Sequence, residues 1–314
     1  MFFLKAAYCR LVQMSFRLVL PLLPYREPDI IPSCKDLSQV FQREKVQSAL
    51  IVTDAGIVAN GLAASTVPYI IYDKTQPNPT VSNVEEALTL YQQNTCNAII
   101  AIGGGSAMDC AKGVGARVAY PKKSLQQMAG VLRVHRRLPT LIAIPTTAGT
   151  GSETTLAAVI TDSGTRHKYA IMSFSLIPHY AVLDAAFTYS LPPHLTAATG
   201  MDALTHAVEA YIGRSTTRET RALALAATQL VFQNVQTAYA EGKNHQAREN
   251  MLHAAYKAGH AFSKSYVGYI HAIAHTLGGF YGVPHGLANA VILPYILDYF
   301  GPSVRKELAE LADL

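Results

Sequence analysis

An apolar strand that runs directly into a run of glycines is the feature that most constrains how this chain can fold. Residues Ala98–Ile102 (AIIAI) are followed at once by Gly103–Ser106 (GGGS). Glycines let a backbone approach a ligand closely, and a following helix, expected to reach about Val118, offers unpaired N–H groups at its start. We expect Ser106 to cap this helix, with Asp109 completing the cap. The arrangement predicts a phosphate-binding turn, although a triple glycine can also form a tight turn that holds no ligand.

Apolar and helical segments alternate through the first part of the chain. The other expected strands are Ala49–Thr53, Pro68–Tyr72, Leu141–Ile144 and Ala157–Thr161, with a helix from about Val81 to Asn94. Such alternation is typical of parallel β-α-β units whose sheet is covered by helices on both faces. From Pro193 onward the apolar residues follow the helical period. We therefore predict an α/β domain over residues 1–187 and an all-α domain over residues 188–314.

Two segments of the N-terminal domain are unusual. Only 13 residues separate Asp54 from Pro68, so a helix between these strands must be short. The segment Met1–Leu23 is rich in apolar residues, but three basic residues interrupt it. We expect this segment to pack on its own domain rather than to serve as a signal peptide or a membrane span.

A second polar loop follows another apolar strand. Pro145–Glu153 (PTTAGTGSE) carries hydroxyl side chains and glycines that suit a pyrophosphate and a ribose. Two such loops at the ends of parallel strands predict a ligand crevice. The motif is not the G-x-G-x-x-G fingerprint, and the comparable acidic residue, Asp54, comes before the glycines rather than about 20 residues after them.

The composition excludes some classes of partner. Charged residues make up 15% of the chain, hydrophobic residues 50%, and the formal net charge is +5. This balance predicts large buried cores and a buried interface in a homo-oligomer. No basic run interleaved with aromatic residues is present, so we expect no nucleic-acid partner. The four cysteines form no C-x-x-C pair and predict reduced thiols in a cytoplasmic protein.

Several histidines have the spacing of metal ligands. Asp202 and His206 are four residues apart, as are His271 and His275, and His285 follows in a V-P-H-G turn. Residues four apart share one face of a helix, and imidazoles with a carboxylate suit iron(II) or zinc. A lone histidine is usually a surface or core residue, but two pairs in apolar helices favour metal binding. The spacing alone does not distinguish His271 from His275 as a ligand.

Four motifs together resemble the iron-containing (group III) alcohol dehydrogenases, a family with zinc-using relatives. These motifs are AIGGGSAMDCAK, IPTTAGTGSE, GMDALTHAVEAY and GYIHAIAHTLGGFYGVPHG, and the similarity runs from about Leu37 to Ala309. The resemblance implies a dinucleotide-binding α/β domain and a helical domain, with metal and nicotinamide meeting between them. It also implies that the helical domain is truncated, because family members usually extend further.

The resemblance assigns roles to individual residues. It implies that the metal ligands are Asp202, His206, His271 and His285, and that His275 lies near the substrate outside the ligand set. It further implies a cofactor site formed by Asp54, Asn78, Gly104, Gly105, Ser106, Asp109, Thr146, Thr147, Lys168 and Leu183. Asp54 would bind the adenosine ribose, and its charge would repel a 2′-phosphate, which predicts NAD rather than NADP.

The expected activity is interconversion of a small alcohol and its aldehyde by metal-assisted hydride transfer to or from NAD. The resemblance also implies a homodimer, and we expect no membrane partner. The metal would polarise the substrate oxygen, and His275 would relay the hydroxyl proton because its pKa should lie near working pH. A straight-chain alcohol, a diol and lactaldehyde all remain open as substrates. The alternatives are a zinc-dependent glycerol or polyol dehydrogenase of the same fold, and an inactive truncated remnant that serves as an assembly module.

Overall fold

The computed structural model describes residues 25–59, 67–164 and 167–314, together with isolated positions before residue 20. The segment Met1–Leu23 therefore lies almost entirely outside the described residues, and its expected packing stays a prediction. Within the described part of the chain, no helix has both the length and the hydropathy needed to cross a membrane.

The first part of the chain is built on a six-stranded sheet in which every neighbouring pair is parallel. In spatial order its strands are β1 (Asp29–Ile31), β9 (Tyr180–Val182), β6 (Thr140–Pro145), β4 (Ala98–Gly103), β2 (Ala49–Val52) and β3 (Tyr69–Tyr72). The associated helices are α2 (Leu37–Arg43), α3 (Ala55–Ala59), α4 (Val81–Gln93) and α5 (Gly105–Ala119). The short α3 agrees with the short crossover expected after Asp54.

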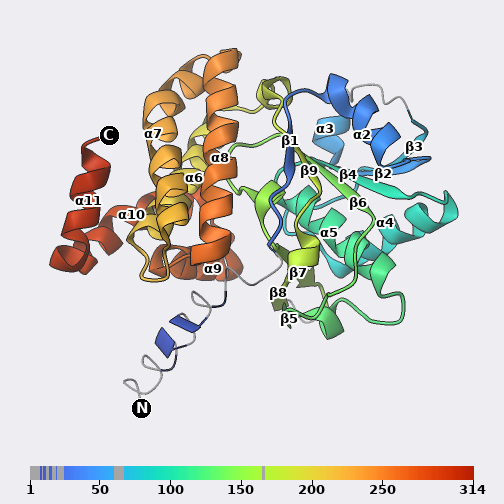
Figure 1. Cartoon of the computed structure of the whole chain (residues 1–314), viewed down its shortest axis with the longest axis horizontal. Coiled ribbons are helices and arrows are strands. Elements are labelled where there is room, and N and C mark those ends of the chain that lie inside the picture. The colour runs from blue at the N-terminus through green and yellow to red at the C-terminus, as the bar shows by residue number, and fades with distance from the viewer. Residues whose placement is uncertain are drawn as a thin grey trace.

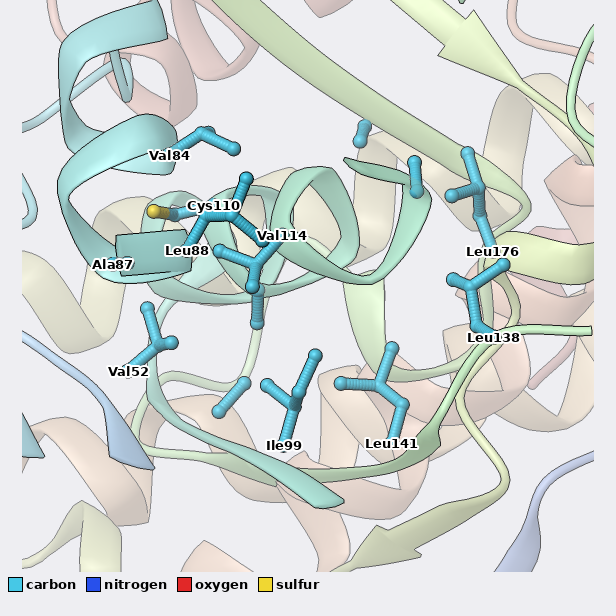
Figure 2. Packing of buried hydrophobic residues seen from close by; sticks show 14 of the residues in the cluster. Val52, Val84, Ala87, Leu88, Ile99, Cys110, Val114, Leu138, Leu141 and Leu176 are labelled. Carbon is cyan, nitrogen blue, oxygen red and sulfur yellow. The ribbon is translucent and has the colours of Figure 1, made fainter. Parts of the chain in front are cut away.

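Both faces of the sheet are buried, because alternate residues of each strand point to opposite sides. On one face, Ile99 and Leu141 pack against α4 and α5, through Leu88 and Val114 among others, as Figure 2 shows. The opposite face, which includes Ile100, packs against α2 in a separate cluster. Fully burying one such side chain stabilises the fold by about 1.5–3 kcal/mol. Because both faces of the sheet are buried, successive residues of a strand are apolar rather than every second one.

A small second sheet departs from the predicted pattern. It consists of β5 (Gly130–Val131), β8 (His167–Met172) and β7 (Ala157–Asp162). The expected strand at Ala157–Thr161 is present, but it pairs antiparallel with β8 instead of joining the main sheet. β7 packs against α5 and is only partly buried. Its residue pattern shows that it is a strand but does not show which strand it pairs with.

From Pro193 onward the structure is helical, as predicted. The helices are α6 (Pro193–Ile212), α7 (Arg218–Ala240), α8 (His245–Ser265), α9 (Tyr269–Tyr281), α10 (His285–Phe300) and α11 (Arg305–Ala312). Short 3-10 helices connect or precede other elements, at Cys34–Asp36, Gln126–Met128, Ser152–Thr154, Phe174–Leu176, Ala185–Thr188 and Gly301–Val304. Figure 1 shows the helical part beside the sheet, with α6, α7 and α8 packed together. The parallel sheet followed by helices confirms the predicted fold class, whereas the division at residue 187 stays a prediction.

A buried lysine fixes the loop that follows β6. The ammonium of Lys112, on α5, is fully buried and donates to five oxygen atoms of Ser152, Thr155 and Ala157 at 2.8–3.0 Å. A buried ammonium is costly unless it is paired or hydrogen-bonded, and here backbone and hydroxyl oxygens surround it. Lys112 thus attaches the end of the second polar loop to the helix that begins at the glycine turn.

Candidate active site

The two polar loops meet at one edge of the sheet. β4 and β6 are neighbours whose last residues, Gly103 and Pro145, are in register, and the Thr146 N–H donates to the Gly103 carbonyl at 3.0 Å. In the sheet, β2 and β4 are neighbours. The chain continues from β2 to β3 towards one edge of the sheet, and from β4 to β6 towards the opposite edge. Ligands of open α/β sheets bind at such a switch point, beyond the carboxyl ends of the strands.

A cleft of about 710 Å³ lies at this switch point. Of the residues predicted to bind cofactor, its lining includes Asp54, Gly104, Gly105, Ser106, Thr146 and Thr147. Leu191, Pro192 and Leu195, where α6 begins, line it as well. A Cβ atom added at Gly104 or Gly105 would press on the side chains of Thr147 and Thr150, so the glycines keep the space between the loops open. The volume falls in the range of small-molecule and cofactor sites.

Asn78 and Lys168 adjoin this cleft through Ser106. The Asn78 N–H donates to Ser106 Oγ at 3.3 Å, and Lys168 Nζ donates to Asn78 Oδ1 at 2.8 Å. The charge of Lys168 also contributes to lowering the pKa values of His275 and His285, after the larger effect of their burial. Lys168 is therefore connected to the glycine turn through Asn78 and Ser106.

Like Asn78 and Lys168, the predicted cofactor residues Asp109 and Leu183 do not line the cleft. Asp109 accepts hydrogen bonds from Ser152 Oγ at 3.1 Å and from the Val159 N–H at 3.0 Å. Leu183 is buried in the core of the helical part. The predicted helix cap is wrong, because α5 begins at Gly105, so that Gly104 is the capping residue and no side chain caps this end. Ser106 instead accepts from Asn78, and Asp109 holds the neighbouring loop.

Three of the predicted metal ligands converge in the helical part. Oδ1 of Asp202, on α6, lies 3.6 Å from Nε2 of His271 on α9 and 3.5 Å from Nε2 of His285 on α10. These three ligand atoms all lie within 4.8 Å of one another, close enough for one ion to bind all three. A carboxylate oxygen with imidazole nitrogens is a donor set suited to a first-row divalent metal.

His206, the fourth predicted ligand, lies beside the other three. Its Nδ1 is 4.0 Å from Asp202 Oδ1, and its ring stacks on His271 with 4.3 Å between the centroids. This buried Nδ1 has no hydrogen-bond partner among the described residues. An unpaired buried nitrogen is costly, and a metal ion bound there would remove that cost.

The charges of the cluster are consistent with metal binding. Burial lowers the pKa of His206 to about 3, assisted by neighbouring imidazoles, so its ring is neutral near pH 7. Burial would raise the pKa of Asp202, but the three imidazoles lower it overall and keep the carboxylate ionised. Burial would lower the pKa of His271, yet hydrogen bonds to Asp202 and Glu209 raise it to about 9. The cluster thus contains an ionised carboxylate beside a protonated His271, whose Nε2 must lose its proton before it can bind a metal ion.

Comparisons with known proteins agree with this geometry. The family model described as "Iron-containing alcohol dehydrogenase" matches residues 32–185, and the model of the family's C-terminal part matches residues 196–314. The chain is 39% identical to the 1,3-propanediol dehydrogenase of Klebsiella pneumoniae, over 96% of this chain and 80% of that protein.

The chain belongs to the iron-containing alcohol dehydrogenase family.

Solved structures support the same conclusion. A 1,3-propanediol oxidoreductase is similar with a TM-score of 0.88 and 38% identity, covering 92% of this chain and 78% of that one. A sulfoacetaldehyde reductase from Bifidobacterium kashiwanohense, solved in complex with NAD⁺, has a TM-score of 0.81 and 31% identity, covering 88% and 75%. These findings confirm the predicted class, an NAD-dependent alcohol dehydrogenase of the iron-containing type, and do not favour the polyol dehydrogenase alternative.

The environment of His275 corrects one part of the sequence interpretation. Its ring stacks on His285 with 4.8 Å between centroids and lies 6.2 Å from His271. Burial, together with the charges of His285 and His271, lowers the pKa of His275 to about 4, not near working pH as expected. In this alcohol dehydrogenase the lowered pKa keeps the His275 ring neutral near pH 7, so one ring nitrogen can accept a proton.

Sequence reasoning missed Asn289 and Glu209. Asn289, four residues after His285 on α10, is fully buried and donates to Asp202 Oδ1 at 2.7 Å. Glu209, seven residues after Asp202 on α6, contacts the Nδ1 atom of His271 at 2.6 Å. Both positions share a helix face with a predicted ligand, so the spacing argument that found the histidines could also have found them.

A glycine sets how closely α10 approaches α6. Gly286 follows the ligand His285, and a Cβ atom added there would overlap the carbonyl oxygen of Ala198, on α6. Backbone atoms cannot move aside as a flexible side chain can, so a larger residue must push the two helices apart. The separation of Asp202 from His285 therefore depends on Gly286.

We expect Gly286→Ala to weaken metal binding at least tenfold, because it separates ligands held by α6 from the ligand on α10. Gly279→Ala is the matched control, since a Cβ atom there meets nothing within 4 Å. Metal content after dialysis against a chelator series, with helicity followed by circular dichroism, measures the effect. Equal metal retention by the two variants would show that the close approach at Gly286 is not required.

Proposed function

We propose that this chain oxidises short-chain primary alcohols, including terminal diols, with NAD, and reduces the corresponding aldehydes. The observation that carries this proposal is the convergence of Asp202, His271 and His285 in the helical part. The cleft at the glycine turn offers a separate site for the cofactor. The similarity to a 1,3-propanediol dehydrogenase supports a small substrate with a terminal hydroxyl.

In this proposal Asp202, His206, His271 and His285 hold iron(II), with zinc as the alternative ion. Bound there, the ion would supply a Lewis acid for the substrate oxygen, and NAD would supply the hydride acceptor. The neutral rings of His206 and His285 and the ionised Asp202 are the protonation states that coordination needs. His271, whose raised pKa of about 9 keeps its ring protonated near pH 7, would release a proton when the ion binds. Asn289 holds Asp202 in place through its amide.

The proposed NAD site uses the cleft of the α/β part. The backbone of Gly104, Gly105 and Ser106, at the start of α5, offers N–H groups to the pyrophosphate. Asp54 would accept hydrogen bonds from the adenosine ribose. Thr146 and Thr147 line the cleft, and Asn78 and Lys168 lie beside Ser106. Asp109 would support the polar loop through Ser152, and Leu183 would support the boundary between the α/β part and the helical part.

For His275 we propose that it accepts the hydroxyl proton of the alcohol and passes it to solvent. The carbon-bound hydrogen leaves as hydride to NAD⁺, so that one alcohol gives one aldehyde, one NADH and one proton. The neutral state of the His275 ring and its place beside His285 support this role. The low pKa means that the proton stays on the ring only briefly.

The reaction is tested by purifying the protein anaerobically, adding iron(II), and following NADH absorbance with alcohols, terminal diols and aldehydes. We expect turnover that is lost on chelation, returns with iron(II), and is abolished in His271→Ala. Turnover insensitive to both treatments would refute the metal mechanism. Zinc binding with glycerol as the sole substrate would instead favour the polyol dehydrogenase, and bound NAD and metal without turnover would favour the inactive remnant.

Asp54 is expected to set the preference for NAD over NADP. Replacing its carboxylate by Asp54→Gly removes the charge that repels a 2′-phosphate, so the ratio of kcat/KM for NAD to that for NADP should fall at least tenfold. Asp36→Gly, at an acidic position outside the cleft lining, serves as the control. An unchanged ratio in Asp54→Gly would refute the assignment.

The proton relay predicts a rate effect specific to His275. We expect His275→Ala to lower kcat about 10²–10⁴-fold, the usual contribution of a positioned base, while metal content stays at the wild-type level. Steady-state kinetics across a pH series, with metal analysis of the same samples, measures both. A wild-type rate and pH profile would remove His275 from the mechanism.

We also propose a homodimer located in the cytoplasm. The low charged fraction supports a buried subunit interface, and Cys34, Cys96 and Cys110 are free thiols. Light scattering of the purified protein would decide the first point, and cell fractionation the second.

A further inference from the structure

A buried carboxylate connects two of the helices that carry the proposed metal ligands. Glu209 lies on α6, three residues after His206 and seven after Asp202, and therefore on the same helix face. Its side chain is almost completely buried between α6 and the start of α9. A buried carboxylate needs partners for both of its oxygens, and the contacts of Glu209 identify them.

Glu209 closes the N-terminal end of α9. Its Oε1 accepts from the Ile270 N–H at 2.8 Å, and its Oε2 accepts from the Gly268 N–H at 2.9 Å. Gly268 is the capping residue of α9 and has no side chain of its own to accept these bonds. A Cβ atom at Gly268 would lie 2.7 Å from Glu209 Oε1, so glycine is what lets the carboxylate come this close. An anion at a helix N-terminus is also favoured by the helix dipole.

The same carboxylate selects the tautomer of His271. Glu209 Oε2 lies 2.6 Å from His271 Nδ1, and because an ionised carboxylate can only accept, Nδ1 must carry the proton. When the ring loses one proton on metal binding, Nδ1 keeps its proton and the lone pair is on Nε2, the atom 3.6 Å from Asp202 Oδ1. The opposite tautomer would place a proton on Nε2, where it would block coordination.

We propose that Glu209 is a positioning residue of the metal centre, which fixes the start of α9 and the tautomer of His271 with one carboxylate. The inference rests on the proposed ligand set. It adds that metal affinity depends on a residue that does not bind the metal itself. Partners of this kind typically account for 10–100-fold in metal affinity.

The direct test is Glu209→Gln, which keeps the size of the side chain. An amide can accept the Nδ1–H through its oxygen, but its NH₂ group then faces an N–H of α9 and the arrangement is disturbed. We expect metal affinity, measured by competition with a chromophoric chelator, to fall 10–100-fold. NADH affinity, measured by fluorescence, should stay within about twofold of wild type, because the cofactor cleft is unaffected.

Thr217→Ala separates this role from simple helix capping. Thr217 caps α7 by accepting from the Thr220 N–H, and the contacts described for it reach no proposed ligand. This variant should lower the midpoint of thermal unfolding, as the loss of a helix cap does, and keep wild-type metal affinity. If Glu209→Gln behaves in the same way, Glu209 is only a cap and the proposal is overturned.

A measurement on the wild-type protein covers the case in which Glu209→Gln fails to fold. Nitrogen-15 NMR of histidine-labelled, zinc-loaded protein reports which ring nitrogen of His271 is protonated, and we expect Nδ1. Protonation of Nε2 would overturn the proposal. If the wild-type chain binds no metal at all, the proposed function fails; if it binds metal and Glu209→Gln binds it equally well, only the present inference fails.

Discussion

The close contact of α6 with α9 and α10 is the constraint on which the proposed chemistry depends. Asp202 and His206 lie on the first of these helices, and His271 and His285 lie on the other two. No single segment could assemble the cluster, so the packing of the helices determines the distances between ligand atoms. Glycine at position 286 permits the close contact of α10 with α6, and the Glu209 carboxylate forms the contact of α6 with α9. Small changes in helix packing should therefore affect metal affinity before they affect the fold.

The cofactor side depends on a different kind of contact. The glycine turn after β4 and the polar loop after β6 are joined by backbone pairing at Gly103 and by the side chains of α5. Asn78 and Lys168 are joined to the glycine turn through Ser106. The start of α6 also lines the cleft, so the α/β part and the helical part both contribute to it.

Local sequence patterns were sufficient for most of the fold but not for all of the site. Strands buried on both faces, such as Ala98–Gly103, are continuous apolar runs that can be recognised without a structure. The pairing of β7 with β8 was missed because it depends on which strand lies alongside, and that is not encoded in a single segment. Similarly, the spacing could not separate His271 from His275, and the lowered pKa of His275 arises first from burial, which depends on how the helices pack. The family resemblance supplied what the spacing left open.

The five hydrogen bonds of Lys112 have a consequence for ligand recognition. They hold the segment from Ser152 to Ala157 in one conformation, so the loop that precedes it reaches the cleft already ordered. The conformational entropy of this segment is therefore lost when the chain folds, and binding of the dinucleotide does not have to order it. Recognition at this side of the cleft is consequently closer to docking on a rigid surface than to induced fit.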